Sequence, residues 1–319
     1  MIAFIFPGQG SQGVGMGRAL AEAFPICRQT FDEADAALGE PISRLCFEGP
    51  AEQLTLTENT QPAILTVSVA AWRLLDSRGC APSVVAGHSL GEYSAHVAAG
   101  TLSFADAVRI VRRRGRFMQE AVPVGAGAMA AILGLDPERV AQACAEAAQG
   151  EVVSPANLNA PGQVVIAGAR DAVGRAGERA RQLGAKRVIP LPVSAPFHCA
   201  LMKPAEERLA PELRALLVAD PRVPVVANVD AEPRRDAAAA IDALVRQVSM
   251  PVRWEDTVRR LASDGVRAYV ELGPGSVLSG LVRKIHREAT VLNLEGPEGL
   301  AAVEALFAAE DRGPLRPAG

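Results

Sequence analysis

The stretch Gly87-His88-Ser89-Leu90-Gly91 lies between a short β-branched run, Ser83 to Ala86, and a segment of helical periodicity from Leu90 to Gly100. This order predicts a strand, a sharp turn and a helix. In such a G-x-S-x-G turn the glycines allow tight closure, so the serine hydroxyl projects at the helix N-terminus, where backbone N–H groups can stabilise an oxyanion. We therefore predict that Ser89 is a nucleophile that attacks a carbonyl carbon. The alternative is an ordinary Gly/Ser turn between a strand and a helix.

A second glycine-rich turn, Pro7-Gly8-Gln9-Gly10-Ser11-Gln12-Gly13, follows the apolar, β-prone run from Ile2 to Phe6. Its glycines match the spacing of a dinucleotide-binding fingerprint. The next segment, Phe31 to Leu38, is helical and acidic, whereas that fingerprint requires a second strand ending in a ribose-binding carboxylate. We favour a loop whose backbone approaches a ligand and leaves the N–H of Gln9 as a hydrogen-bond donor, with nucleotide binding as the alternative.

An arginine interrupts the apolar side of the helix expected from Phe104 to Val122. The inward stripe of this helix is formed by Phe104, Val108, Val111, Met118 and Val122. The helical period places Arg114 on the same side, whereas Arg112 and Arg116 fall on another face and are predicted to be solvated. A guanidinium can bind a carboxylate through two parallel hydrogen bonds, so we predict that Arg114 reaches into a cleft. The alternative is an ion pair with a structural carboxylate.

The segment from 124 to 194 has a different pattern, which begins after the hinge-like Gly125 to Gly127. Its expected elements are a strand at 129–135, a helix at 137–148, strands at 152–157 and 163–167, a helix at 171–183 and a strand at 186–191. The order β-α-β-β-α-β is typical of a ferredoxin-like unit. We predict an α/β protein in which a small domain at 124–194 is inserted into a large domain made of residues 1–123 and 195–319, with a substrate cleft between them.

The chain has four histidines, and His198 lies on the loop that returns from this unit to the large domain. His88 neighbours the serine, but adjacent residues at a strand end point to opposite faces. His286 lies in an Arg/Lys-rich helix and is predicted to be solvated, and His96 lies one helical turn from Glu92, with which it is predicted to form a solvated pair. We therefore predict that His198 is the general base, with a structural loop histidine as the alternative.

Composition and charge restrict the class of function. The chain has 319 residues, of which 49% are hydrophobic, a net charge of -3 and a pI of about 5.9. This charge argues against nucleic acid as a general partner. The five cysteines are dispersed and lack a C-x-x-C pair, so we expect neither a disulfide framework nor a zinc site. The N-terminus lacks the features of a signal peptide and no apolar run reaches membrane-spanning length, so we expect a cytoplasmic protein that does not bind membranes.

Seven segments of the chain occur in an order that is typical of one family. They are FPGQGSQ from Phe6, GHSLGEYSA from Gly87, RGRFMQEAVP from Arg114, NAPGQVVIAG from Asn159, PFHCALM from Pro196, PVRW from Pro251 and ELGPG from Glu271. Together they resemble the bacterial malonyl-CoA:acyl carrier protein transacylases over nearly the full length. The resemblance implies an α/β-hydrolase-like large domain with an inserted ferredoxin-like small domain, which agrees with the segmentation above. It also implies transfer of a malonyl group from malonyl-CoA to the phosphopantetheine thiol of acyl carrier protein, which supplies fatty acid synthesis.

The resemblance implies catalytic roles for residues at matching positions. The nucleophile is Ser89 and the base is His198, which is oriented by the backbone carbonyl of Gln247 instead of a carboxylate. The oxyanion donors are the backbone N–H groups of Gln9 and Leu90. This arrangement implies a malonyl-serine intermediate and ping-pong kinetics.

The residues that contact substrate are implied in the same way. They are Arg114 for the malonyl carboxylate, Gln9 at the oxyanion, Phe197 beside the acyl group, and Asn159, Lys186 and Arg187 toward the pantetheine arm or the phosphates. Phe197 precedes His198 at the position where related acyltransferases select the extender unit, and the resemblance favours malonyl over methylmalonyl. No metal or redox cofactor is implied.

The implied partners are malonyl-CoA and holo acyl carrier protein. Acyl carrier protein is acidic, so docking is expected to use exposed basic residues despite the negative net charge. The candidates are Arg112, Arg113, Lys186 and Arg187. We expect the chain to be a monomer.

Three other functions fit part of the sequence. The same elbow occurs in esterases and lipases, but Arg114 on the inward face and the inserted domain argue against a hydrolase. A polyketide-synthase acyltransferase or a malonate decarboxylase component would perform the same malonyl transfer in another pathway. A non-catalytic module that binds carrier proteins is expected to lack the serine or the histidine, and Ser89 and His198 are both present.

Overall fold

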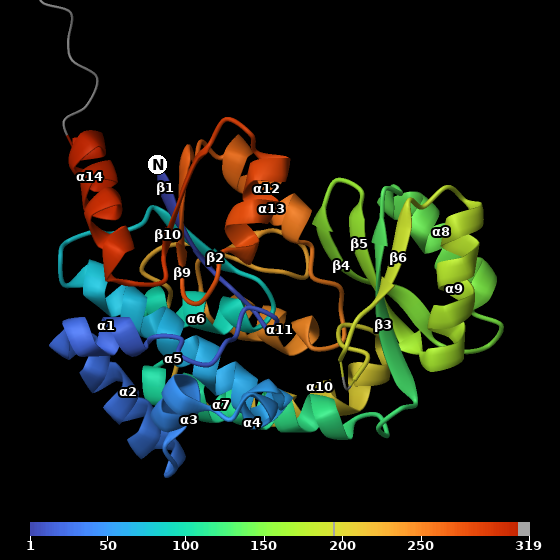
Figure 1. Ribbon diagram of the computed structural model, residues 1–319, viewed down its shortest axis with the longest axis horizontal. Coiled ribbons are helices and arrows are strands. Elements are labelled where there is room, and N and C mark those ends of the chain that lie inside the picture. The colour runs from blue at the N-terminus through green and yellow to red at the C-terminus, as the bar shows by residue number, and fades with distance from the viewer. Residues whose placement is uncertain (194, 312–319) are drawn as a thin grey trace, which may run out of the picture.

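The computed structural model describes residues 1–193 and 195–311, and its larger part is built on a six-stranded sheet (Figure 1). The strand order is β10-β9-β1-β2-β7-β8, and every neighbouring pair is parallel except β7 and β8. The strands are β1 (Ile2–Phe6), β2 (Val84–Gly87), β7 (Val225–Val226), β8 (Pro233–Arg234), β9 (Ala268–Leu272) and β10 (Thr290–Leu294). All residues of β1 and β2 are buried, as expected for central parallel strands that are covered on both faces.

Helices cover both faces of this sheet. They are α1 (Arg18–Ala23), α2 (Pro25–Leu38), α3 (Ile42–Glu48), α4 (Ala51–Thr55), α5 (Thr57–Asp76), α6 (Leu90–Ala98), α7 (Phe104–Glu120), α10 (Lys203–Arg214), α11 (Ala237–Gln247), α12 (Trp254–Ser263), α13 (Val277–Ile285) and α14 (Leu300–Asp311), with 3-10 turns η1 (Ala200–Met202) and η2 (Pro297–Gly299). Because side chains alternate along a strand, Phe4 and Phe6 pack into the core that contains α5, whereas Ile5 packs against α12 and α13.

The register of the central strands brings two loops together. Phe6 at the end of β1 pairs with Gly87 at the end of β2. The glycine-rich loop after β1 and the turn after β2 therefore leave the sheet side by side at its carboxyl edge, where ligands bind in open α/β sheets.

A smaller, four-stranded antiparallel sheet lies beside the larger part (Figure 1). Its elements are β3 (Gly127–Leu133), α8 (Pro137–Ala147), β4 (Val153–Ala160), β5 (Gln163–Ala169), α9 (Arg170–Gln182) and β6 (Arg187–Pro190), and the strand order is β4-β5-β3-β6. This chain order is the β-α-β-β-α-β order that the sequence predicts. Both helices pack on one face of the sheet around a core of its own that includes Ile132, Val140 and Val164.

The two parts are joined by a short parallel bridge between Asn157 on β4 and Val252, just before α12. The N–H of Leu158 donates to the carbonyl of Val252, and the N–H of Val252 donates to the carbonyl of Ala156, both at 2.9 Å. The predicted end of the inserted segment, residue 194, lies outside the described residues. Among the described residues, no helix is both long and apolar enough to cross a membrane.

The prediction that Glu92 and His96 form a solvated pair is wrong, because both side chains are 0% exposed. Helix α6 is enclosed by the sheet and by α5 and α7, and all of its residues are buried. A helix without a solvated face does not sort polar from apolar residues by side, so periodicity alone could not place this pair.

Two further predictions of solvation need correction. The Arg112 side chain is only 15% exposed, because it pairs with Glu40 and donates to Asn59. His286 is partly buried against the ring of Tyr269. Arg116, in contrast, is 51% exposed, as predicted.

Burial of His96 makes the stability of the protein depend on pH. Neither ring nitrogen of His96 has a hydrogen-bond partner among the described residues, and burial together with the charge of Arg234 lowers its pKa to about 3. In the unfolded chain the pKa is about 6.5, so between these values only the unfolded chain binds the proton, and the free energy of unfolding falls as the pH falls.

We expect His96→Leu to remove this dependence. Between pH 6.5 and 5, the wild type should lose about 2 kcal/mol more of its unfolding free energy than the variant. Urea denaturation of both proteins at the two pH values measures the difference. Equal losses in the two proteins would contradict the assignment of a neutral, buried imidazole.

Candidate active site

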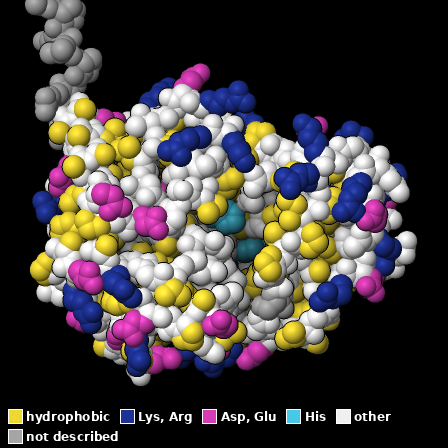
Figure 2. Space-filling view, viewed as in Figure 1, with side chains coloured by type: hydrophobic (Ala, Val, Ile, Leu, Met, Phe, Trp, Pro, Cys, Tyr) yellow, Lys and Arg dark blue, Asp and Glu magenta, His cyan; other side chains and the backbone are white. Residues whose placement is uncertain are grey.

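A cleft of about 830 Å³ separates the two sheets. Its walls include Ser89 and His198 from the larger part and Met129, Asn157 and Leu191 from the smaller part. Figure 2 shows histidine side chains at the bottom of this hollow. Its volume is in the range of small-molecule sites, and it opens at the carboxyl edge of the large sheet.

Ser89 occupies a strained turn between β2 and α6. Its backbone angles are φ 51° and ψ -105°, a conformation that side-chain-bearing residues seldom adopt. A Cβ atom on Gly87 would lie 1.9 Å from the carbonyl carbon of Gly91, and one on Gly91 would lie 1.9 Å from the carbonyl oxygen of Phe6. Both positions therefore require glycine, as the elbow pattern predicts.

His198 lies between the serine hydroxyl and a backbone carbonyl. Its Nε2 is 2.7 Å from Oγ of Ser89, and its Nδ1 is 2.9 Å from the carbonyl oxygen of Gln247. Because a carbonyl only accepts hydrogen bonds, Nδ1 carries the proton and Nε2 has the lone pair that faces the serine. Burial and the charge of Arg114 lower the pKa of His198 to about 3, so the imidazole is neutral and able to accept the serine proton.

Arg114 is a buried cation whose hydrogen-bond partners are all neutral. It is 1% exposed, and burial lowers its pKa from the ordinary value. Nη1 donates to Oε1 of Gln61 at 2.8 Å, and Nη2 donates to Oγ of Ser89 at 3.0 Å and to Oε1 of Gln247 at 2.8 Å. Within the described ranges no carboxylate forms an ion pair with this guanidinium. The charge therefore stands beside the serine without a counter-ion in contact.

The two residues that the resemblance implies as oxyanion donors lie at the cleft near Ser89. Gln9 and Leu90 both line it, and for the part of the chain that the structure describes no acceptor is found for either N–H. A Cβ on Gly8 would lie 2.4 Å from the carbonyl oxygen of His88, which shows how closely the first glycine-rich loop rests on the elbow. Leu90 begins α6, so its N–H also lies at the positive end of the helix dipole.

Of the remaining residues for which the resemblance implies a role in substrate binding, only Phe197 lines the cleft. Phe197 lines it and is 8% exposed. Asn159 does not line it, but its Oδ1 is 2.9 Å from Nε2 of His88. Lys186 and Arg187 do not line it either, and both are exposed at the beginning of β6.

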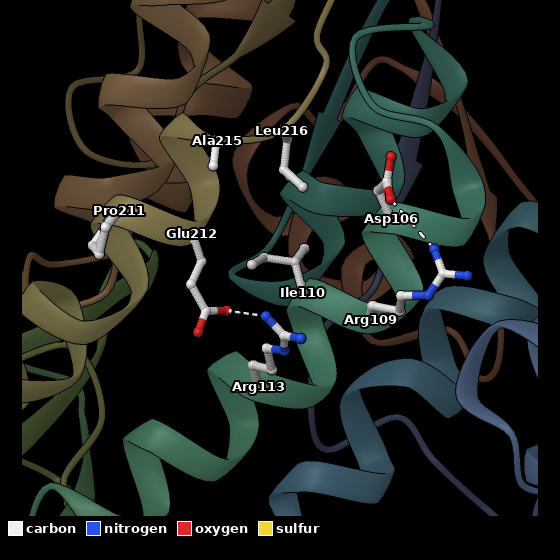
Figure 3. Close-up of a pocket in the computed structure, with 8 residues that line it drawn as sticks. All are labelled: Asp106, Arg109, Ile110, Arg113, Pro211, Glu212, Ala215 and Leu216. Atoms are coloured by element: carbon white, nitrogen blue, oxygen red, sulfur yellow. Dashed lines mark hydrogen bonds and ion pairs between the residues drawn. The ribbon is translucent and has the colours of Figure 1, made fainter.

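A second hollow of about 430 Å³ lies between α7 and α10 (Figure 3). Its charged residues are already paired: Arg113 with Glu212 at 2.9 Å, and Arg109 with Asp106 at 3.4 Å. It contains no nucleophile and no histidine. Of these two hollows in the described part of the chain, only the cleft between the sheets contains a serine next to a histidine.

Sequence reasoning missed three residues of the site. Gln61 and Asn228 contact Arg114 and Ser89 directly, and Glu92 contacts Asn228. One signal was available for Asn228, because it follows the parallel strand β7, whose carboxyl end meets the same edge of the sheet as the elbow.

The chain resembles known proteins over nearly its full length. Residues 3–299 match the family model described as acyl transferase domain. A malonyl CoA-acyl carrier protein transacylase of Salmonella typhimurium is 55% identical over 301 residues, which cover 94% of this chain and 97% of the relative. The protein of the same name from Bacillus subtilis is 51% identical over 298 residues, with coverage of 93% and 94%.

The fold of the chain is also similar to that of solved structures over nearly its full length. The crystal structure of an acyl carrier protein S-malonyltransferase from Vibrio cholerae superposes with a TM-score of 0.93 at 51% identity, covering 95% of this chain and 99% of that one. A malonyl-transacylase in complex with a holo type II PKS acyl-carrier protein gives a TM-score of 0.94 at 50% identity, with coverage of 96% and 99%.

The elbow geometry predicts the effect of adding one methyl group. Gly91→Ala would push a Cβ against the backbone oxygen of Phe6, and no side-chain rotation relieves this overlap. We expect a loss of about 1–3 kcal/mol or more in unfolding free energy, together with loss of Ser89 labelling by a fluorophosphonate. Gly13→Ala is the control, since nothing lies within 4 Å of its Cβ. Unchanged labelling in Gly91→Ala would contradict this geometry.

Proposed function

This chain belongs to the family of malonyl-CoA:acyl carrier protein transacylases. On that premise we propose that it transfers a malonyl group from malonyl-CoA to the phosphopantetheine thiol of holo acyl carrier protein. This reaction supplies fatty acid synthesis. One observation carries the choice of substrate. The buried guanidinium of Arg114 donates to the nucleophile's own hydroxyl and has only neutral partners. An acyl group that bears a carboxylate supplies the missing negative charge.

The first half-reaction begins with proton transfer. Nε2 of His198 takes the proton of Ser89 Oγ, and the oxygen attacks the thioester carbonyl of malonyl-CoA. Arg114 exchanges its contact with the hydroxyl for the malonyl carboxylate and so fixes the acyl group beside the nucleophile. The carbonyl of Gln247 holds the imidazole in the required tautomer.

The N–H groups of Gln9 and Leu90 stabilise the tetrahedral oxyanion. His198 then gives its proton to the leaving CoA sulfur, and a malonyl-serine ester remains. The pantetheine thiol of acyl carrier protein enters the same cleft, loses its proton to His198 and removes the malonyl group by the reverse sequence of steps. The two substrates thus use the site in turn, which gives ping-pong kinetics.

We assign the two parts of the molecule to two domains. Residues 1–123 and 195–319 form an α/β-hydrolase-like catalytic domain, supported by the mostly parallel sheet with the serine at its carboxyl edge. Residues 124–194 form a ferredoxin-like domain, supported by the β-α-β-β-α-β order and by a separate core. The cleft then lies at the domain interface.

Phe197 restricts the acyl group. Its ring is almost fully buried in the wall of the cleft next to the base. A bulky side chain at this place leaves little room for the extra methyl group of methylmalonyl, in accord with a preference for malonyl.

We place the docking of acyl carrier protein at the edge of the smaller sheet where β6 begins. Lys186 and Arg187 are exposed there and form no ion pair among the described residues. The register pairs Leu133 with both Gln163 and Arg187, and Nζ of Lys284 donates to Oε1 of Gln163 at 3.1 Å. Basic side chains from both parts of the molecule therefore lie at the end of the smaller sheet where β3 ends and β5 and β6 begin, and there they can attract an acidic partner.

Arg112 and Arg113 are less suited to docking than the sequence suggests. Arg112 is mostly buried and pairs with Glu40, and Arg113 pairs with Glu212.

A related carrier protein is a second candidate partner, because one solved relative is bound to a type II PKS acyl-carrier protein.

Mass spectrometry of the intact protein tests the proposed chemistry. After brief exposure to malonyl-CoA we expect a malonyl adduct on the wild type and none on Ser89→Ala. The same exposure to acetyl-CoA provides the comparison for Arg114→Ala. In this variant we expect malonyl loading to fall by about 100-fold relative to acetyl loading, since a charge-assisted contact to the malonyl carboxylate is lost. Holo acyl carrier protein should discharge the adduct. Steady release of free CoA without an adduct would instead indicate a hydrolase.

Charge reversal tests the docking edge. We expect Lys186→Glu with Arg187→Glu to slow discharge by acyl carrier protein about 10-fold at low salt and to slow loading from malonyl-CoA less. Arg44→Glu is the control, because Arg44 is also exposed but lies on α3, away from β6, and pairs with Glu48 of the same helix. Equal discharge rates in all of these proteins would contradict this placement.

A further inference from the structure

Three buried side chains lie beneath the elbow. Glu92, Asn228 and Gln247 are each 0% exposed, and they come from α6, from the segment after β7 and from the end of α11. The proposed mechanism uses only the backbone carbonyl of Gln247.

The two amides clamp the backbone of the nucleophile. Oδ1 of Asn228 accepts from the N–H of Ser89, and its Nδ2 donates to the carbonyl of Gly87, both at 2.7 Å. Nε2 of Gln247 donates to the carbonyl of Ser89 at 2.8 Å. The N–H and the C=O of the strained residue are thus both held by buried side chains.

The Gln247 side chain also connects the elbow with the cation. Its Oε1 accepts from Nη2 of Arg114 at 2.8 Å, while its backbone carbonyl accepts from His198 at 2.9 Å. Nucleophile, base and guanidinium therefore all contact this one residue. A rotation of its amide by half a turn would exchange oxygen and nitrogen and would direct an N–H group at Arg114.

Glu92 fixes the direction of this amide. Its Oε2 accepts from Nε2 of Gln247 at 2.8 Å and from the N–H of Asn228 at 3.0 Å. With an acceptor on one side and the Arg114 donor on the other, only one orientation of the Gln247 amide satisfies both neighbours. The same oxygen holds the backbone of Asn228 in place.

We propose that Glu92 is a positioning residue for malonyl transfer: by accepting hydrogen bonds from Gln247 and Asn228, it holds the Ser89 elbow in its strained conformation and aims Arg114. This inference rests on the proposed function. Burial raises the pKa of Glu92 to about 7, and either protonation state retains an acceptor oxygen toward the two donors. The role is therefore that of an acceptor, and a neutral amide can replace it.

The test compares Glu92→Ala with Glu92→Gln. Two rates are measured: malonyl loading from saturating malonyl-CoA by rapid quench and intact mass, and labelling of Ser89 by a neutral fluorophosphonate. We expect Glu92→Ala to slow both by about 100-fold, because a displaced nucleophile fails with either reagent. Glu92→Gln should restore both to within about fivefold of the wild type, because the amide oxygen accepts both hydrogen bonds.

Glu271 provides a matched control. It is also an acid that is 0% exposed, and it accepts from the backbone N–H groups of Leu278 and Ser279 at 3.1 and 2.7 Å, at the start of α13. Glu271→Ala is expected to lower the thermal stability, while the folded protein keeps the wild-type rates. If Glu92→Ala does not fold, Asn228→Ala takes its place, since it removes both of the amide's contacts to the elbow and is expected to slow both reactions.

Three results would overturn the proposal. They are wild-type rates in folded Glu92→Ala or, where it is used instead, in Asn228→Ala, failure of Glu92→Gln to restore the rates, and equal slowing in Glu271→Ala. A wild type that reacts with fluorophosphonate but takes no malonyl group would refute the proposed function instead, and the fluorophosphonate rates would still decide on the positioning role.

Discussion

The contact between the Arg114 guanidinium and the Ser89 hydroxyl is the interaction around which the cleft is organised. A buried cation with neutral hydrogen-bond partners is costly in free energy, because the protein replaces its hydration by amide and hydroxyl dipoles and by the ring of Tyr93. Burial, together with the same charge, makes a protonated imidazole at His198 unfavourable and keeps the imidazole neutral. This one guanidinium, which no carboxylate contacts among the described residues, thus acts on both the serine hydroxyl and the imidazole.

The elbow shows how the fold accommodates local strain. A positive φ at a serine costs roughly 1–3 kcal/mol, and each buried hydrogen bond contributes about 1 kcal/mol. The contacts of Asn228 and Gln247 to the backbone around Ser89 are therefore of the right size to offset this cost. Close packing of Gly91 on Phe6 leaves the turn no room to relax. The strain persists because strand ends and buried amides determine the turn from two sides.

Local sequence pattern predicts several of the elements and part of the site. The elbow between β2 and α6, the inward side of Arg114 and the β-α-β-β-α-β order all follow from spacing within short windows. The prediction of a solvated Glu92 is wrong because all residues of α6 are buried, so its polar residues do not lie on an exposed face. Asn228 lies 139 positions from Ser89, so its hydrogen bond to the elbow depends on the strand order of the sheet, which no short window contains. The pairing of His198 with the Gln247 carbonyl was inferred only from the resemblance, since every residue has a backbone carbonyl and its position carries no compositional signal.

The bridge between Asn157 and Val252 has a mechanical consequence for the cleft. It pins the edge of the smaller sheet to the segment that leads from Gln247 into α12, so the two walls share a fixed line of contact. A change in the width of the cleft that keeps the two backbone hydrogen bonds of this bridge is a rotation about that line, because sliding along it would break them. Because Asn157 itself lines the cleft, this line of contact lies at the wall of the cleft. A rotation about that line moves the outer rim of the cleft farther than it moves the wall beside Asn157.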